Sequence, residues 1–251
     1  MKFSIIVPTF NSAKYLSSTL ESISMQNYEN IEVLLADGGS KDETLEIASG
    51  YKFVRVVSRK DNGQTDGINK AYQFVTGDIV AWQNSDDLYK DGALHKVAEI
   101  FRNTESDVVY GDYVLINEKG GEIRKCKSHQ WRSDRFRTGR FVPLQPTAFW
   151  RKRVSDKVFP LDADLNYCMD VDFFAKADIA GFKFHYTDDF LGSFRIHETG
   201  KTSQYKDMLR VLSEHGRVLK RHYRLRIGEH FRLQKNLGRI FLAKLYLNAK
   251  G

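Results

Sequence analysis

The first 90 residues alternate between short apolar segments and amphipathic segments, and this alternation constrains the fold more than any other feature. Strongly apolar segments of strand length lie at residues 3–7, 31–36, 53–58 and 79–82. Between the first two, Leu16, Leu20 and Ile23 recur at the spacing that aligns side chains on one face of a helix. Strands that alternate with helices through short loops predict an α/β protein with a mostly parallel, doubly wound sheet.

The segment at residues 76–89 joins a buried strand to a cluster of polar side chains. Residues 79–82 are nearly all apolar, as in a strand covered on both faces, and Asn84, Ser85, Asp86 and Asp87 follow directly. Ligands of open α/β sheets bind at the carboxyl ends of the strands. Because neighbouring carboxylates repel each other, they need a cation or hydrogen-bond donors, and a divalent metal is the simplest choice. A solvated turn that caps the next helix is the alternative.

Carboxylates also follow the second and third predicted strands. Asp37 ends the second strand, and Asp61 and Asp66 follow the third. A row of acids at one edge of a sheet suits a nucleoside-diphosphate site, in which carboxylates accept hydrogen bonds from base and ribose and hold a metal beside the diphosphate. Taken singly, each of these acids is explained as well by a helix cap or a turn.

Several common catalytic and nucleotide-binding motifs are missing from the sequence. The first strand is followed by Thr9, Phe10 and Asn11, so the glycine-rich turn of a dinucleotide site is excluded. Gly200, Lys201 and Thr202 do not form a P-loop, because the earlier glycine position is an arginine. The sequence also has no Gly-x-Ser-x-Gly elbow and no His-Glu-x-x-His motif.

Beyond residue 90 the pattern becomes that of a mixed sheet. A helix is predicted by the apolar spacing of Leu94, Val97, Ala98 and Phe101. Earlier in the chain, residues 40–43 predict a capping box that opens a helix. The other predictions are strands at 107–117 and 121–126 around a turn at 119–121, a mobile loop at 128–140, a strand region at 143–150, a helix at 166–180, short strands at 182–186 and 190–195, and helices after residue 200.

The end of the chain carries most of its positive charge. Residues 201–251 contain 13 Lys and Arg against 3 Asp and Glu, a formal charge of +10, so residues 1–200 carry −3 of the total of +7. This asymmetry favours an anionic partner for the tail, either a membrane surface or a nucleic acid. Two apolar stripes predict helices that pack on the body or lie on a membrane: Met208, Leu212 and Leu219, then Leu233, Leu237, Ile240, Phe241 and Leu245.

Two further features concern the compartment. Pro8 interrupts the apolar start of the chain, and no segment approaches the ~20 apolar residues that a spanning helix needs. Cys126 and Cys168 are the only cysteines, and they lack the spacing of metal ligands. We therefore expect a protein of the reducing cytoplasm, peripheral on the inner face of the cell membrane if the tail binds lipid.

The ordered set of motifs resembles family 2 glycosyltransferases of the GT-A fold over about the first 200 residues. Single motifs of this kind are weakly specific, whereas the set in order is much more so. The motifs are Val-Pro-Thr-Phe-Asn at 7–11, Asp-Gly-Gly-Ser-Lys-Asp at 37–42, Asp-x-Gly at 61–63 continuing to Asn69, Thr-Gly-Asp at 76–78, Asn-Ser-Asp-Asp at 84–87, Gln-Pro-Thr at 145–147, Tyr-Cys-Met-Asp-Val-Asp at 167–172 and Ser-Phe-Arg-Ile-His at 193–197.

The resemblance implies a nucleoside-diphosphate sugar donor, with UDP favoured over GDP, a divalent metal (Mn²⁺ or Mg²⁺), and inversion at the anomeric carbon. By position, Thr9 and Asp37 would contact the base, with Asp66 nearby. Asp86 would serve the ribose or the sugar and Asp87 the metal, with Asp86 and His197 as further metal ligands. The remaining nucleotide- or substrate-binding candidates are Pro8, Asn11, Gly39, Asp61, Gly63, Asn69, Asn84, Ser85, Gln145 and Arg195.

Asp170 matches the catalytic base of the family. An inverting transfer needs a base opposite the leaving diphosphate, to take the proton of the acceptor hydroxyl. Met169 stands where relatives often have Glu, so Asp172 is a reserve candidate, although the two aspartates would point about 200° apart on a helix. An ordinary acidic helix start is the alternative. Two other departures are Gly38, where the family often has a second Asp, and Asn84, in place of the first acid of Asp-x-Asp.

Our interpretation from sequence is an inverting, metal-dependent glycosyltransferase that extends a bacterial-type surface glycan on a glycan or lipid-linked acceptor. Residues 1–90 would bind the donor, 91–200 the acceptor, and 201–251 would form a basic helical extension. A sugar-phosphate nucleotidyltransferase is one alternative, but it requires a glycine- and arginine-rich turn after the first strand. A nucleic-acid-binding protein that uses the basic tail is the other, but the acidic strand ends would repel phosphate unless a metal were bound.

Overall fold

The computed structural model describes residues 1–58, 61–198, 200–201 and 205–248. The strands are β1 Phe3–Thr9, β2 Ile31–Asp37, β3 Val54–Ser58, β4 Ile79–Trp82, β5 Leu88–Tyr89, β6 Val108–Ile116, β7 Glu122–Cys126, β8 Ala148–Arg151 and β9 Phe184–Arg195. The helices are α1 Ala13–Ser24, α2 Thr44–Ser49, α3 Gln64–Tyr72, α4 Ala93–Asn103, α5 Ser133–Phe136, η1 Gln145–Thr147 (a 3₁₀ turn), α6 Lys152–Val158, α7 Met169–Ile179, α8 Tyr205–His222 and α9 Ile227–Asn248.

Within the described chain, nine strands form one sheet in the order β3-β2-β1-β4-β8-β6-β9-β5, with β7 paired to β6. The pairs β3–β2, β2–β1 and β1–β4 are parallel. In the second half β6–β9 is parallel, whereas β8 runs antiparallel to both β4 and β6. The predicted mixed sheet with flanking helices is therefore confirmed.

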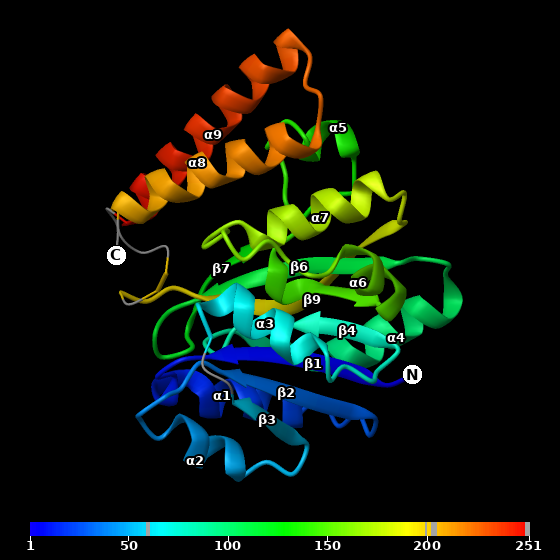
Figure 1. Ribbon diagram of the computed structural model, residues 1–251, viewed down its shortest axis with the longest axis vertical. Helices are drawn as coiled ribbons and strands as arrows, with labels where there is room; N and C mark the ends of the chain where they lie inside the picture. The colour runs from blue at the N-terminus through cyan, green and yellow to red at the C-terminus, as the bar shows by residue number, and fades with distance from the viewer. Residues whose placement is uncertain (59–60, 199, 202–204, 249–251) are drawn as a thin grey trace.

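The chain leaves β1 toward β2 and β3 and then returns to place β4 on the other side of β1. This reversal makes the carboxyl ends of β1 and β4 the switch point of the sheet, where ligands of open α/β sheets bind. Figure 1 shows the helical pair α8–α9 stacked beyond α7, at the end of the molecule opposite β2 and β3. The second half and the tail thus lie on one side of the switch point, and β2 and β3 lie on the other.

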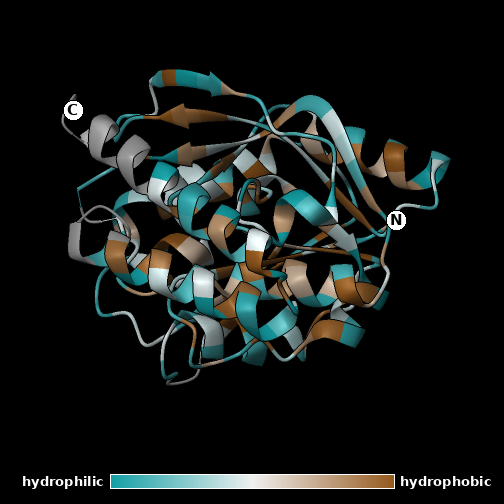
Figure 2. Ribbon diagram, turned by 90° about the horizontal axis from the view of Figure 1, so that it is seen from above, coloured by the Kyte–Doolittle hydropathy of each residue, from teal (hydrophilic) through white to brown (hydrophobic). Residues whose placement is uncertain are grey.

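Both faces of the sheet are buried, which explains the nearly continuous apolar strands. Ile5 and Val7 point into a core with Leu16 and Leu20 of α1, whereas Ile6 points to the opposite face. That opposite core contains residues of α3, α6, α7, α8 and α9. The helices show bands of both hydrophobic and hydrophilic residues, as expected for elements with one buried side (Figure 2).

The capping box predicted at residues 40–43 is wrong. α2 begins only at Thr44, and its N-cap Glu43 makes no side-chain capping bond. The Ser40 hydroxyl donates to Asp37 instead, at 2.5 Å. Because Asp37 lies three residues before Ser40, a bond within the loop replaces the expected start of the helix.

Two predictions for the second half also need correction. The segment at 128–140 is packed and not a mobile loop, because Phe136 is fully buried and Trp131 stacks on Phe184 with ring centroids 3.7 Å apart. It contains the one-turn helix α5. The two short strands predicted at 182–186 and 190–195 are one strand, β9, whose pairing with β6 shifts register between Tyr110 and Tyr113.

The tail is helical, as predicted, and packs against the body. Val218, Leu219, Leu233 and Leu237 are buried in the core that also contains α7. The side chains of Met208, Ile240, Phe241 and Leu245, which belonged to the predicted stripes, lie outside the described residues. Among the helices that the structure describes, none is both long and apolar enough to cross a membrane.

Candidate active site

The loops after β1, β2 and β4 meet at the switch point. The Ser85 hydroxyl donates to that of Ser12 at 2.9 Å, which joins the loops after β4 and β1. The Asn11 backbone N–H donates to Ser40 Oγ, and the Lys41 backbone N–H donates to Asn11 Oδ1, both at 2.9 Å. Asn11 has φ +49°, a conformation that Asn tolerates better than most residues. Asn11 and Ser85, both predicted to bind the nucleotide, therefore hold the three loops together.

Asp37 orders the loop that follows it. Its carboxylate is 1% exposed and accepts hydrogen bonds from the Thr9 hydroxyl and from the backbone N–H groups of Gly39 and Ser40. Gly39 takes φ +96°, which favours glycine at this position. Pro8 and Thr9 are buried beside it at the end of β1. The structure therefore places the predicted base-contacting pair Thr9–Asp37 beneath the surface of the site.

Asp61 lies against two glycines, Gly38 and Gly67. A Cβ atom at Gly38 would lie 2.9 Å from Asp61 Oδ2, and one at Gly67 would lie 2.8 Å from it. Asp61 Oδ1 also accepts the Gly63 N–H, and Gly63 has φ +115°. The Asp61 carboxylate thus occupies the space into which a side chain at position 38 would project.

Two other predicted nucleotide-binding residues have structural partners. Asp66 accepts hydrogen bonds from Lys70 at 2.8 Å and from Asn62 N–H, and these bonds hold the pKa of Asp66 below its usual value. Asn69 donates to the carbonyl of Leu161 and accepts its N–H, at 2.9 and 2.8 Å. The prediction that Asn69 contacts the nucleotide does not fit this geometry, since both ends of its amide bind the backbone of the second half.

Asp87 is buried and satisfied by neighbouring donors. The residue is 1% exposed; its Oδ1 accepts the Arg195 N–H and its Oδ2 accepts Asn84 Nδ2, both at 3.0 Å. Burial and the charge of Asp86 raise the pKa of Asp87, against the effect of the two donors. This geometry does not favour the predicted role of Asp87 as the metal ligand, because both of its oxygens accept hydrogen bonds within the protein.

Asn84 connects Asp87 to the second half of the sheet. Its Nδ2 also donates to Gln145 Oε1 at 3.1 Å, and its Oδ1 accepts Gln64 Nε2 at 3.0 Å. Gln145 in turn donates to the Trp82 carbonyl. A carboxylate at position 84 would have no proton to donate to Asp87 or Gln145. The amide therefore explains the second departure from the family pattern, and Gln145, predicted to bind substrate, supports it.

The Arg195 side chain binds the backbone at Asp86 and the backbone of the turn that follows β6. Its Nε donates to the Asp86 carbonyl at 2.8 Å and its Nη1 to the Glu118 carbonyl at 2.9 Å, and its guanidinium lies 4.9 Å from the centre of the Tyr15 ring. Arg195 is 5% exposed. It is a structural residue here and does not fit the predicted contact with substrate.

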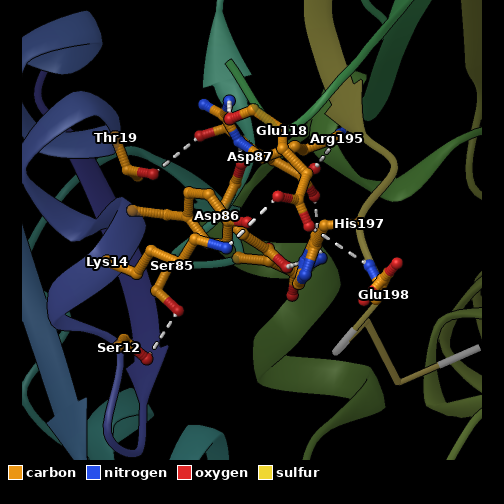
Figure 3. A network of polar contacts seen from close by, with 12 residues as sticks. Ser12, Lys14, Thr19, Ser85, Asp86, Asp87, Glu118, Arg195, His197 and Glu198 are labelled. Carbon is orange, nitrogen blue, oxygen red and sulfur yellow. Dashed lines mark hydrogen bonds and ion pairs between the residues drawn. The ribbon is translucent and has the colours of Figure 1, made fainter. Parts of the chain in front are cut away.

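Asp86 and His197 face each other at the site (Figure 3). His197 Nε2 lies 2.9 Å from Asp86 Oδ2; the Asp86 side chain is 31% exposed, whereas that of His197 is only 6% exposed. The two atoms are at ordinary hydrogen-bond distance, which is also close to the ~3 Å that separates neighbouring ligands of an octahedral ion with bonds of ~2.1 Å. Within the described chain, no three His, Cys, Asp or Glu side chains are grouped to hold a metal alone. The remaining ligands would have to be substrate oxygens and water, as is usual for Mg²⁺.

Asp170 is the second residue of α7 and is partly exposed; its Oδ1 lies 2.8 Å from the Val171 N–H. Asp172 is fully buried between His222 Nε2 at 2.6 Å and Lys176 Nζ at 2.7 Å. Burial raises the pKa of Asp172, but the hydrogen bonds from His222 and Lys176 outweigh it and keep the pKa below its usual value. Asp172 is therefore unsuited to the role of reserve base, because it is inaccessible and already paired.

Sequence reasoning missed two residues at this site. Phe10 follows β1 directly and is 66% exposed, an unusual position for a large aromatic side chain at a strand end. Glu214 of α8 reaches the segment in front of Asp170. The sequence did contain a signal for Phe10, because an aromatic residue stands there between the polar residues that end the strand. Glu214 had none, because its partners are backbone groups more than 40 residues away.

A doubly wound sheet with carboxylates at its switch point is typical of nucleotide-binding α/β proteins. The model of the family "Glycosyl transferase family 2" matches residues 4–151, more than half of the chain, and the chain belongs to this family. The sheet, its flanking helices and the helical C-terminal extension correspond to the GT-A fold, as solved relatives show.

Two solved structures illustrate the similarity of fold. Crystalline S. aureus TarS 1–349 with UDP-GlcNAc superposes with a TM-score of 0.68 at 22% identity, over 97% of this chain and 72% of that chain. The mannosyltransferase PcManGT from Pyrobaculum calidifontis, solved with GDP-Man and Mn²⁺, gives 0.70 at 18% identity, over 99% and 73%. At these identities the likeness shows the fold alone.

Curated relatives are similar over shorter regions. An uncharacterized glycosyltransferase of Nostoc sp. is 27% identical over 176 residues, which is 64% of this chain and 54% of the relative. A PGL/p-HBAD biosynthesis glycosyltransferase of Mycobacterium bovis is 38% identical over 121 residues, which is 45% and 47%. The chain thus spans about half the length of these two relatives.

Proposed function

We propose that this protein is an inverting glycosyltransferase that moves a sugar from a nucleoside-diphosphate donor, with UDP favoured over GDP, to a glycan or lipid-linked glycan. The observation that carries the proposal is the partly exposed Asp86 carboxylate, with His197 Nε2 2.9 Å from it, at the switch point of a family 2 chain. TarS with UDP-GlcNAc and PcManGT with GDP-Man and Mn²⁺ support the donor class and the metal.

In this proposal Asp86 and His197 hold Mn²⁺ or Mg²⁺, whose charge would stabilise the departing diphosphate. The exposed ring of Phe10 offers a face on which the base stacks, beside the loops that Asp37 and Asn11 order. Asp87 serves the metal indirectly, because it fixes the backbone of Arg195 two residues before His197. This assignment keeps Asp86 and His197, which the sequence named as further ligands, at the metal and gives Asp87 a structural role in place of the predicted metal contact.

Asp170 takes the proton of the acceptor hydroxyl as that oxygen attacks the anomeric carbon. Two adjacent residues of α3 connect this base to the donor site: Gln64 binds Asn84, and the Thr65 hydroxyl donates to the Leu165 carbonyl at 2.8 Å. The segment that leads to Asp170 is therefore tied to the same helix as the residues below the metal site. This connection through α3 supports a fixed position of the base relative to the donor site.

The tail favours an acceptor at a membrane. Ile227 and Phe231 of α9 are 79% and 73% exposed, one helical turn apart, and basic residues surround them in the sequence. The turn between α8 and α9 forms one end of the molecule (Figure 1). Exposed apolar side chains among cations suit an anionic membrane surface, and a relative in PGL/p-HBAD biosynthesis is consistent with an envelope acceptor. Family membership gives no support to a nucleotidyltransferase or to nucleic-acid binding.

A nucleotide screen tests the proposal. Thermal unfolding should shift upward with UDP or GDP only when Mn²⁺ or Mg²⁺ is also present, because binding to the folded state alone stabilises it. The responding nucleotide then selects the nucleotide sugars for a turnover assay with lipid-linked and free glycan acceptors. The absence of both a metal-dependent shift and sugar transfer with any donor would refute the proposal.

A further inference from the structure

We propose that Glu214 of α8 is a positioning residue for the base Asp170, an inference that rests on the proposed function. Its carboxylate side chain is 11% exposed. Oε1 accepts the Asn166 N–H at 3.1 Å, and Oε2 accepts the N–H groups of Tyr167 and Cys168 at 2.8 and 3.0 Å. One side chain from the C-terminal extension thus fixes three consecutive backbone groups directly before the helix of the base.

These three N–H groups lead into α7, which begins at Met169, so Asp170 is only two residues beyond the last of them. The start of a helix has backbone N–H groups without intrahelical partners and a partial positive charge, and a carboxylate there stabilises it. Cys168, at the N-cap, points its thiol at the Val211 carbonyl of α8, 3.4 Å away. Of the three N–H groups that Glu214 binds, that of Cys168 belongs to the helix start, and the other two belong to the segment that leads into it.

Other contacts of α8 act on the same region. The Tyr167 hydroxyl donates to Asp207 at 2.8 Å, and His222 pairs with Asp172 at 2.6 Å. Glu214 and His222 are eight residues apart on α8, a separation of ~12 Å along the helix. The base therefore lies between two anchor points of α8, one before α7 and one in its first turn.

The opposite side of the segment is held by α3, through Thr65 to Leu165 and Asn69 to Leu161. The segment at 161–168 is consequently bound by α3 of the donor half and by α8 of the extension. Losing either set of contacts would let the start of α7 move. Since α3 also contacts Asn84, the position of the base relative to the donor depends on α8.

This arrangement gives the extension a part in the reaction. From sequence alone we expected residues 201–251 to form helices that pack on the body or lie on a membrane. The contacts of Glu214 and His222 show that α8 reaches the segment and helix that carry Asp170. Our inference is that α8 belongs to the catalytic unit, while the exposed apolar residues of α9 remain available for location.

The test compares Glu214→Ala and Glu214→Gln with wild type in sugar transfer. The Ala variant removes all three hydrogen bonds, whereas Gln keeps one acceptor oxygen in place. Displacement of a reacting group by ~1 Å costs about 10²-fold in rate, so kcat should fall by about that factor in Glu214→Ala and less in Glu214→Gln. The KM for donor should not change, since the donor contacts lie on other loops.

Glu229→Gln is the matched control. Glu229 of α9 pairs with Arg137 at 2.6 Å and so joins the extension to the body away from the base. We expect its kcat to equal that of wild type. Equal kcat values for Glu214→Ala and Glu229→Gln, or a rise in donor KM with unchanged kcat in Glu214→Ala, would overturn the proposal.

Hydrogen exchange provides a readout that does not need activity. The amides of residues 166–168 should exchange faster in both Glu214 variants than in wild type and Glu229→Gln, while those of β1 should be unchanged. If wild type transfers no sugar but the amides of residues 166–168 exchange faster in the variants, the proposed function is refuted, whereas the role of Glu214 in holding this segment is not. Unchanged exchange at residues 166–168 in the Glu214 variants would refute the role of Glu214, even if the enzyme is active. This test holds even if Glu214→Ala fails to fold, because Glu214→Gln preserves the shape of the side chain.

Discussion

His197 Nε2 lies 2.9 Å from Asp86 Oδ2, although 111 residues separate them in the sequence. β9 brings them together: Arg195, its last residue, binds Asp87 through its backbone N–H and Asp86 through its side chain. The buried carboxylate thus positions the strand end, and the accessible carboxylate faces the histidine. Adjacent aspartates have opposite roles because one points into the protein and the other out of it.

Replacing each of the two aspartates by alanine should separate these roles. Asp86→Ala should abolish the metal-dependent part of UDP or GDP binding with little effect on stability, because its carboxylate is partly exposed. Asp87→Ala should lower the free energy of unfolding by about 1–3 kcal/mol, since it leaves buried donors of Asn84 and Arg195 without an acceptor. Calorimetry and urea unfolding measure the two effects. Metal-dependent affinity that survives in Asp86→Ala would contradict the assignment.

Asp170 and Asp172 should differ in the same way. In Asp170→Asn we expect kcat to fall by ~10²–10⁴ with unchanged donor affinity, because the amide cannot accept the acceptor proton. Asp172→Asn should instead destabilise the protein by several kcal/mol, up to the ~3–5 typical of a broken buried ion pair, because His222 and Lys176 lose their partner. Its kcat per folded molecule should change much less. An inactive, stable Asp172→Asn would show that the base has been assigned to the wrong aspartate.

The fold was predictable from sequence to the extent that it depends on local patterns. The strands at β1, β2 and β4 are continuous apolar segments, and Leu94, Val97, Ala98 and Phe101 lie buried on one face of α4, as their spacing predicts. What failed depends on contacts between distant residues. Asn69 was assigned to the nucleotide by its place in the family motif, whereas the partner that it has in the structure, Leu161, lies 92 residues later.

The two departures from the family pattern illustrate the same limit. Gly38 and Asn84 looked like losses of acidic groups. In the structure Gly38 makes room for Asp61, and Asn84 donates to both Asp87 and Gln145. Such compensation involves three elements at once, so a single sequence shows the substitution but not its cause.

Glu32 should make stability depend on pH in the acidic range. Burial raises its pKa, but hydrogen bonds from Lys2, Ser4 and Thr76 overcome this and lower the pKa to about 2, from 4.5. A depressed pKa stabilises the folded state above the unfolded value of 4.5, and this contribution is lost as the pH falls from about 4.5 toward 2. Allowing for solvent screening, the loss is about 2 kcal/mol.

Urea unfolding of wild type and Glu32→Gln between pH 7 and pH 3 measures this contribution. The variant should be less stable at pH 7, and its stability should fall less steeply toward pH 3. Lys2→Met is a useful companion, because it removes one donor and retains the carboxylate, so it should lose only part of the pH dependence. Parallel pH profiles for wild type and Glu32→Gln would show that Glu32 is not the group responsible.

The exposed apolar pair on α9 gives the most direct test of membrane binding. Ile227 and Phe231 lie at the start of α9, where their replacement removes no buried contact, whereas Leu233 and Leu237 are buried and hold the helix to the body. Deletion of α9 would therefore confuse unfolding with loss of binding. Ile227→Ser with Phe231→Ser should keep the unfolding temperature and reduce co-sedimentation with vesicles that contain anionic lipid, because burial of these side chains in the interface drives insertion.

The basic residues should act through charge. Reversing the exposed Arg224 and Lys235 to Glu should weaken vesicle binding further, by on the order of 1 kcal/mol for each cation removed, and salt should erase most of the difference. Sugar transfer to a soluble acceptor should be unchanged in these variants, since neither they nor the apolar pair contact α7 or the switch point. Equal co-sedimentation of wild type and both double variants at low salt would mean that α9 only packs on the catalytic domain, and the acceptor would then have to be sought in solution.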